Sequence, residues 1–264
     1  MYAFNYSKVS SVADAAAAVG KNAEAKLLAG GQTLLASMKL RLANPPQLID
    51  LANVKELTGI KVDGNGVTIG AMTRHAEVAM SKDVQAAIPA LAALAGGIGD
   101  RMVRNMGTIG GSVANNDPAA DYPAAVVGLG ATITTNKRTI AGDSFFTGIF
   151  STALQAGEII TSITFPKAKR AAYMKFKNPA SRYAIVGVFV AESSTGVRVA
   201  VTGAGPCVYR VADMEKALTA KWAPESVANI KVSDKGLNSD IHASNEYRAH
   251  LVTIMAKRAV AAAK

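Results

Sequence analysis

Two pairs of adjacent glycines stand where an anion could bind. The first lies in Leu28-Ala29-Gly30-Gly31-Gln32-Thr33-Leu34 and the second in Thr108-Ile109-Gly110-Gly111-Ser112. Adjacent glycines let the backbone approach a ligand closely, and their N–H groups can form an anion-binding concavity. Thr33 and Ser112 can each donate to a phosphate oxygen, and a helix starting after Thr33 would add its positive end. Two such sites together suit a pyrophosphate.

Either pair alone is more often a tight turn, because glycine is the ordinary residue of turns. Neither pair fits the common nucleotide motifs. Gly-x-Gly-x-x-Gly does not follow a strand anywhere in the chain, and Gly-x-x-x-x-Gly-Lys-Ser/Thr is absent. The sequence therefore gives no support to a Rossmann or P-loop site.

Other residues that could do chemistry have a simpler interpretation. His75 has no second histidine or cysteine nearby in the sequence, so it is expected to be a surface histidine at the start of a helix. Asp117 and Asp121 could act as an acid–base pair or could cap turns beside Pro118. Cys207 is expected to be a small buried residue, because no base pairs with it.

Arg101 and Arg104 either approach cofactor phosphates or are solvated, and the sequence leaves both options open. The basic stretch from Lys167 to Lys177 contains two aromatic residues, and the C-terminal helix carries lysine and arginine among apolar residues. The expected role of that helix is docking or capping, with its charges in solvent.

The elements that must position these residues alternate between strands and helices, which indicates an α+β fold with mixed sheets. Asp63-Gly64-Asn65-Gly66 and Ser193-Ser194-Thr195-Gly196 predict antiparallel hairpins. Thr73 is expected to cap a helix that ends near Met80. The remaining expected strands are 26–29, 47–50, 131–135 with 137–140, 184–191 and 197–201, and the expected helices are 12–20, 34–41, 88–95, 124–129, 211–219 and 245 to the C-terminus.

Composition narrows the function classes. The 264 residues are 50% hydrophobic, which excludes a disordered chain, and 29 Lys+Arg against 19 Asp+Glu give a net charge of +10. That charge indicates an acidic partner, such as a nucleic acid, a membrane surface, an anionic cofactor or a protein. A single cysteine excludes an internal disulfide and a cysteine-ligated metal site built by this chain alone. No signal peptide or membrane span is evident, so a soluble, cytoplasmic protein is expected.

The two motifs, together with the sequence around the second, resemble the FAD-binding medium subunit of the molybdenum hydroxylases. That surrounding sequence is Arg104-Asn105-Met106-Gly107-Thr108-Ile109-Gly110-Gly111-Ser112-Val113-Ala114-Asn115. This family includes carbon monoxide dehydrogenase and xanthine dehydrogenase. The likeness covers nearly the whole chain, including Leu48-Ile49-Asp50-Leu51, Asp117-Pro118-Ala119-Ala120-Asp121 and Lys175-Phe176-Lys177. It implies a PCMH (vanillyl-alcohol-oxidase-type) FAD-binding fold of two α/β subdomains at 1–170, followed by a small C-terminal domain with an antiparallel sheet and helices at 171–264.

The resemblance also implies which residues bind FAD. Asp121 would hydrogen-bond the cofactor, Ile98 would pack on the flavin or adenine, and Ile160 would meet a ring through its backbone. Lys177 would lie near the flavin and Tyr183 beside the isoalloxazine. The first FAD loop would be Leu28, Ala29, Gly30, Gly31, Gln32, Thr33 and Leu34, and the second Thr108, Ile109, Gly110, Gly111 and Ser112.

The implied function is electron transfer within a complex, with no catalytic residue on this chain. A large subunit would hold molybdenum–pterin, a small subunit would hold [2Fe–2S] clusters, and FAD here would pass electrons to NAD⁺, a quinone, a carrier protein or oxygen. A dimer of heterotrimers is expected. Carbon monoxide dehydrogenases often have His-Ser where this chain has Gln32-Thr33, which argues against carbon monoxide as the substrate.

Two alternatives compete with this interpretation. A free-standing FAD oxidoreductase of the same fold would need an additional substrate domain, for which 264 residues leave little room. A basic nucleic-acid-binding module would interleave Lys and Arg with aromatic residues, yet aromatic residues make up only 6% of the chain.

Overall fold

The computed structural model describes residues 1–264, and its first part is a small parallel α/β layer. The three-stranded sheet has the order β1-β3-β2, with both pairs parallel. Ser11 caps the first helix by accepting from the N–H of Asp14, as the sequence predicts. The elements are β1 (Asn5–Lys8), α1 (Val12–Lys21), β2 (Lys26–Leu28), α2 (Leu34–Lys39) and β3 (Gln47–Asp50).

The second part is a five-stranded antiparallel sheet with helices on one face. Its order is β4-β5-β10-β6-β7, so β10 joins two hairpins that are far apart in the sequence. The strands are β4 (Ile60–Val62), β5 (Gly66–Gly70), β6 (Thr132–Thr135), β7 (Thr139–Ala141) and β10 (Ile160–Pro166), with β8 (Phe146–Gly148) and β9 (Ser151–Thr152) as a separate pair. The helices are α3 (His75–Met80), α4 (Lys82–Ala87), α5 (Pro89–Gly96), α6 (Arg101–Met106), α7 (Ile109–Asn115) and α8 (Tyr122–Gly128), and short 3-10 turns lie at η1 (Lys55–Leu57) and η2 (Gly142–Ser144).

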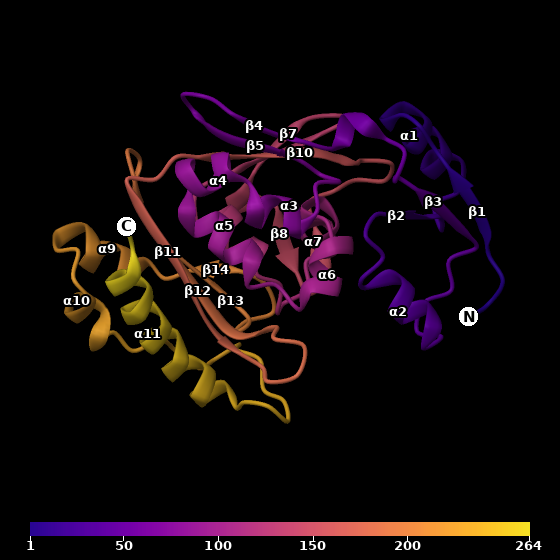
Figure 1. The fold of residues 1–264 in the computed structure, drawn as a ribbon. Helices are drawn as coiled ribbons and strands as arrows, with labels where there is room; N and C mark the ends of the chain where they lie inside the picture. Colours follow the sequence, from indigo (N-terminus) through magenta and orange to yellow (C-terminus); the bar gives the residue numbers. More distant parts are fainter.

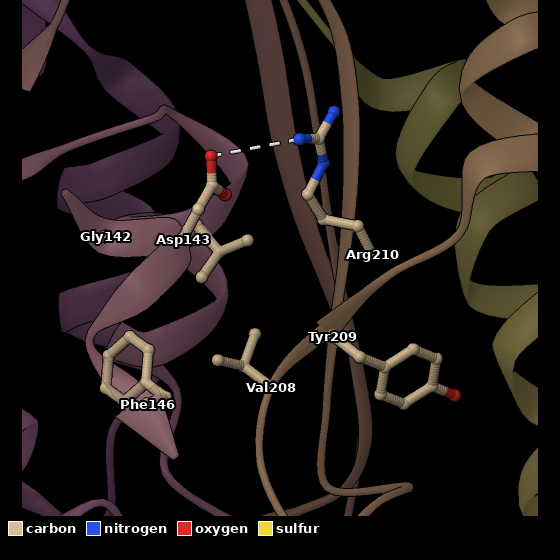
Figure 2. A pocket seen from close by; sticks show the side chains of 7 residues that line it. Gly142, Asp143, Phe146, Val208, Tyr209 and Arg210 are labelled. Atoms are coloured by element: carbon tan, nitrogen blue, oxygen red, sulfur yellow. Dashed lines mark ion pairs between the residues drawn. The ribbon is translucent and has the colours of Figure 1, made fainter. Parts of the chain in front are cut away.

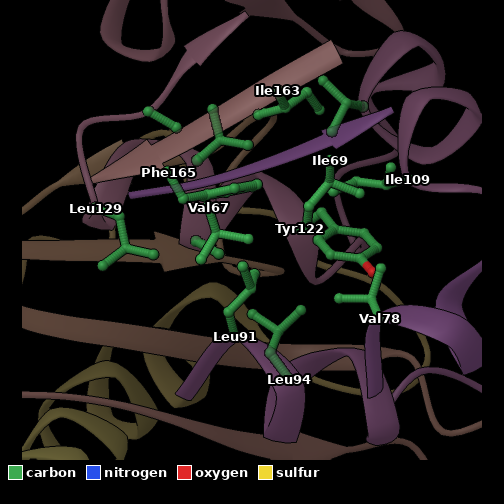
Figure 3. Packing of buried hydrophobic residues seen from close by; sticks show 14 of the residues in the cluster. Val67, Ile69, Val78, Leu91, Leu94, Ile109, Tyr122, Leu129, Ile163 and Phe165 are labelled. Carbon is green, nitrogen blue, oxygen red and sulfur yellow. The ribbon is translucent and has the colours of Figure 1, made fainter. Parts of the chain in front are cut away.

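The largest core lies between this sheet and its helices. In Figure 3, Val67 and Ile69 of β5 and Ile163 of β10 face Leu91 of α5. Alternate residues of a strand point to one face, so the apolar residues of β5 and β10 fall on the helix side. Tyr122 of α8 is fully buried in the same cluster.

The third part is a four-stranded antiparallel sheet covered by three helices. Its order is β11-β12-β13-β14, and α11 packs on β11 and β12 around a second core. The elements are β11 (Arg170–Lys177), β12 (Ala184–Ser193), β13 (Gly196–Thr202), β14 (Tyr209–Arg210), α9 (Ala212–Ala220), α10 (Pro224–Ala228) and α11 (Asn245–Ala262).

The second and third parts interlock. Phe189 and Ala191 of β12 are buried in the core of the five-stranded sheet rather than in their own. The hydroxyl of Thr202 donates to carbonyl oxygens of the segment before α8. A cavity of about 250 Å³ lies at this boundary, and the ion pair of Asp143 and Arg210, 3.8 Å apart, lines it (Figure 2). Its lining contains no residue of either glycine motif.

The expected strands and helices all occur, with ends shifted by a few residues. The two turn sequences form their hairpins, β4–β5 and β12–β13. The expected cap at Thr73 is wrong, because Arg74 is the N-cap of α3. The buried hydroxyl of Thr73 instead accepts from the N–H of Gly59 and donates to the carbonyl of Gly59. Because these hydrogen bonds are to a residue distant in the sequence, the side chain does not cap the helix. No helix is long and apolar enough to cross a membrane.

Candidate functional site

The fold brings the two glycine motifs together. Gly30 lies directly against the backbone of Met106 and Gly107, so that a Cβ at Gly30 would be 2.7 Å from the Cα of Gly107. A Cβ at Gly111 would be 3.5 Å from the Cβ of Ala29. Segments about 80 residues apart therefore share one surface, and the absence of a side chain at Gly30 permits the close contact.

The first motif exposes a row of unused donors. None of the five consecutive backbone N–H groups of residues 29–33 donates a hydrogen bond within the chain. These residues form the loop between β2 and α2, and Gly31 has φ +69, which a glycine adopts without strain. Unpaired backbone donors beside a second glycine motif are the chemistry that a bound pyrophosphate satisfies. The residues present thus fit an anionic nucleotide.

The second motif differs from the expected loop. Thr108 is the N-cap of α7, and Gly110 and Gly111 lie in its first turn. The N–H groups of Ile109 and Gly110 donate to carbonyl oxygens of Thr73 and Ala71, so this motif forms no free anion-binding concavity of its own. The second motif can offer a ligand two other features. Gly111 has no side chain, and the hydroxyl of Ser112 has no hydrogen-bond partner in the chain.

Two expected contact residues lie in other elements, and a third belongs to the second motif itself. Ile98 lies half-buried in the turn between α5 and α6. Ile160 is the first residue of β10. The carbonyl of the next residue, Thr161, accepts from the N–H of Ala71, and the carbonyl of Ala71 accepts from the N–H of Gly110, so the start of β10 is linked to the second motif. The side chain of Ile109 is fully buried in the core, so it supports α7 from behind.

Asp121 lies in a buried ionic cluster that joins the second and third parts of the chain. It is 4% exposed, and its carboxylate accepts from Tyr173 Oη at 2.5 Å and from Lys175 Nζ at 3.0 Å. Burial raises the pKa of Asp121, and Lys175 and Tyr173 partly oppose that rise. Asp117 instead accepts from the N–H of Ala119, as a turn residue does.

Lys177 and Tyr183 flank the connection between β11 and β12. Lys177 is exposed at the end of β11, and the hydroxyl of Tyr183 accepts from the side-chain amide of Asn178. The residue after Tyr183, Ala184, donates its N–H to Ala119, which places this connection beside the segment that carries Asp121. The structure thus brings Lys177 and Tyr183 to the same side of the molecule as Asp121.

The expectation for His75 is wrong, because this residue is 4% exposed. Its ring packs on that of Tyr122 at 5.3 Å, and Gly107 lies so close that a Cβ there would be 2.6 Å from His75 Nε2. Burial and nearby Arg104 lower the pKa of His75 to about 4, so the ring is neutral at pH 7. Its Nδ1 and the hydroxyl of Tyr122 are both buried without a partner.

Of the two arginines that the sequence leaves open, Arg101 is exposed and Arg104 has a structural role. Arg104 donates to the carbonyl oxygens of Ile98 and Gly99 at 2.9 and 3.0 Å, and this contact holds the turn that carries Ile98. Cys207 is half-buried, and burial raises the pKa of its thiol, so it is not an activated nucleophile. No group of three or more His, Cys, Asp or Glu side chains is arranged to hold a metal ion.

Sequence reasoning missed Lys175, although Lys175-Phe176-Lys177 drew attention as a stretch. The alternation of side chains along a strand could have found it. Residues 173 and 175 lie on the same face of β11, so Lys175 and Tyr173 both reach Asp121.

Comparisons with known proteins match the family that the motifs resemble, along nearly the whole chain. Residues 2–168 match the family model described as FAD binding domain in molybdopterin dehydrogenase, and residues 171–263 match the CO dehydrogenase flavoprotein C-terminal domain. The chain is 35% identical to the carbon monoxide dehydrogenase medium chain of Hydrogenophaga pseudoflava, covering 98% of this chain and 96% of the relative. Identity and coverage are the same for the nicotine 6-hydroxylase medium subunit of Paenarthrobacter nicotinovorans. The solved structure of carbon monoxide dehydrogenase from Hydrogenophaga pseudoflava, lacking the Mo-pyranopterin moiety, superposes with a TM-score of 0.89 over 99% of this chain and 97% of that chain, at 35% identity.

Proposed function

Because this chain belongs to the FAD-binding medium subunits of the molybdenum hydroxylases, we propose that it binds FAD across its two glycine motifs and relays electrons from a partner's [2Fe–2S] clusters to an external acceptor. It is an oxidoreductase subunit of the carbon monoxide dehydrogenase and xanthine dehydrogenase type. The molybdenum–pterin and the iron–sulfur clusters would lie on a large and a small partner subunit, in a dimer of heterotrimers.

One observation carries the site assignment: the row of unpaired N–H groups at residues 29–33, next to Gly111 and the free hydroxyl of Ser112. A pyrophosphate would accept from these donors at the positive end of α2. The other proposed contacts are Leu28, Leu34, Ile98, Thr108, Ile109, Gly110, Asp121, Ile160, Lys177 and Tyr183.

The chain's own contribution is to bind, orient and shield the cofactor. FAD supplies the redox chemistry, accepting electrons singly or in pairs when bound. The backbone of the first motif would fix the pyrophosphate, and half-buried Ile98 would offer apolar surface to a ring system. Ile160 is only 5% exposed, so it would contact a ring through its backbone. Lys177, exposed and cationic at the end of β11, would stabilise negative charge that develops on the ring. No side chain here is assigned a proton-transfer step.

The division of the chain at residues 170 and 171 is part of the same proposal, as is a cytoplasmic location. The substrate belongs to the chemistry of the large subunit. The relatives act on substrates as different as carbon monoxide and nicotine according to their names, so this chain alone does not select among them.

The direct test is to purify the full chain and record its visible spectrum. Absorbance bands near ~370 and ~450 nm, with FAD released on denaturation, are the expected result. A colourless protein that cannot be reconstituted with FAD would refute the proposal. Purification from cells that also express the neighbouring genes then tests the partners: co-purification of a large and a small subunit is expected, whereas a flavoprotein that stays alone would support a free-standing oxidoreductase.

A further inference from the structure

The turn between α5 and α6, residues 97–99, is held by two cations from different parts of the chain. Lys175 Nζ donates to the carbonyl of Gly97 at 2.9 Å. Arg104 donates to the carbonyls of Ile98 and Gly99 at 2.9 and 3.0 Å. Three consecutive carbonyl oxygens therefore point at charged donors, and side chains fix the path of the backbone here.

Lys175 reaches this turn from the C-terminal sheet. Its side chain is 8% exposed, and its ammonium group lies 3.0 Å from Asp121. Gly97 is also the C-cap of α5, where a cation is favoured by the helix dipole. The lysine thus neutralises a buried carboxylate and closes the end of a helix at the same time.

The strand is built to bring Lys175 there. Tyr173, two residues earlier on β11, donates to Asp121 and stacks on Phe189 at 6.3 Å. Lys175 pairs with Gly187 of β12, and a Cβ on that glycine would fall 2.8 Å from Tyr173 Cζ. Only the absence of a side chain at Gly187 lets the tyrosine ring lie where it meets Asp121.

The 97–99 turn leads into α6, whose last residue, Met106, lies with its backbone against Gly30 of the first motif. We propose that Lys175 is a positioning residue of the cofactor site, which holds this turn, and with it Ile98 and the start of α6, in the conformation that receives FAD. Besides its proposed contact with FAD, Asp121 acts through Lys175, by fixing the ammonium group between the two parts of the chain. This inference rests on the proposed function, because it assigns a residue to the FAD site. It gives the C-terminal domain a direct part in shaping that site.

A double variant tests the inference. Lys175→Met alone would leave Asp121 buried and unpaired, which destabilises a protein strongly, so Asp121→Asn is combined with it. In the double variant neither Lys175 nor Asp121 leaves a buried charge behind, but the carbonyl of Gly97 loses its Lys175 donor. The control is Lys169→Met. Lys169 directly precedes the same strand, its side chain is 72% exposed, and it pairs with Glu192 at 3.4 Å.

Two readouts are measured on the full chain: FAD affinity by flavin fluorescence, and hydrogen exchange of residues 97–104 in the FAD-free protein. The double variant is expected to melt cooperatively, to exchange that segment about tenfold faster and to bind FAD about tenfold more weakly, as for loss of one charge-assisted hydrogen bond. The control should match the wild type in both.

Wild-type FAD affinity in a folded double variant would overturn the inference, whatever its exchange rate. The single variant Asp121→Asn keeps the Lys175 donor to Gly97, so it should bind FAD more tightly than the double variant and exchange residues 97–104 more slowly. Equal losses of FAD affinity in Asp121→Asn and in the double variant would assign the effect to Asp121 itself and overturn the inference. If the wild-type chain itself took up no FAD, the proposed function would fail first and this inference would fall with it, so the two failures can be told apart.

Discussion

Gly30 and Met106 meet backbone to backbone, with no side chain between them. Met106 ends α6, and the residue after it, Gly107, directly precedes the second motif. The contact therefore joins the loop that carries unpaired N–H groups to the segment that leads into α7. Everything proposed for the nucleotide depends on these two segments keeping this distance.

Gly30→Ala should abolish FAD binding. The new Cβ would lie 2.7 Å from the Cα of Gly107 and 2.8 Å from the carbonyl carbon of Met106, and neither backbone atom can yield as a flexible side chain could. The ratio of flavin to protein absorbance measures the effect. Gly64→Ala is the matched control, because nothing lies within 4 Å of a Cβ there. Full flavin content in a folded Gly30→Ala protein would contradict the site.

Ser112→Ala should weaken FAD binding without lowering stability, because the hydroxyl has no partner within the chain. A several-fold rise in the FAD dissociation constant is expected, about that of one hydrogen bond. Thr108→Val should also lower stability, by about 1 kcal/mol of unfolding free energy, since it removes the cap of α7. Fluorescence titration and thermal melts distinguish the two, and equal effects of both variants on stability would argue against the assignment.

His75 should make the protein acid-sensitive. Its pKa is about 4 when folded, against the usual 6.5 when unfolded, so the unfolded chain binds the proton more tightly. The free energy of unfolding therefore has its full value above pH 6.5. It falls as the pH drops from 6.5 to 4, by about 3 kcal/mol in total, because burying His75 opposes its protonation. Denaturant titrations of wild type and His75→Gln across this range should differ in slope. The exposed His250 supplies the control variant, His250→Gln. Parallel pH profiles for wild type and His75→Gln would refute the role.

Gly187→Ala should destabilise the junction of the two sheets. Its Cβ would overlap the half-buried ring of Tyr173, and displacing that ring breaks the hydrogen bond to Asp121. A loss of about 1–3 kcal/mol of unfolding free energy is expected for such overpacking. Gly148→Ala, where the nearest atom is 3.9 Å from a Cβ, is the control. A melting temperature unchanged from wild type would show that Tyr173 can be accommodated elsewhere.

Local signals predicted most of the elements, because turns such as Asp63-Gly64-Asn65-Gly66 and caps such as Ser11 depend on neighbours in the sequence. The errors fall where a distant segment decides. Thr73 leaves its helix for Gly59, and His75 is covered by Tyr122. Nothing near either residue in the sequence reports these partners.

The site shows the same limit. Glycine spacing was enough to bring residues 29–33 and 108–112 together as one candidate, but not to show that only the first motif keeps its N–H groups free. That difference arises because Ala71 and Thr73 accept from the second motif. Lys175 was missed because its partners, Asp121 and Gly97, lie 54 and 78 residues away.

The interlocking of β12 with the main core has a consequence for how the protein is made. Phe189 and Ala191 fill a core whose other members come from residues 67 to 165, so a growing chain displays that apolar sheet and its helices before their last two packing partners exist. Synthesis proceeds from the N-terminus at about 5–20 residues per second, which leaves the unfinished core exposed for seconds. During that interval the growing chain is open to chaperones and to aggregation, and the core closes only after β12 has left the ribosome.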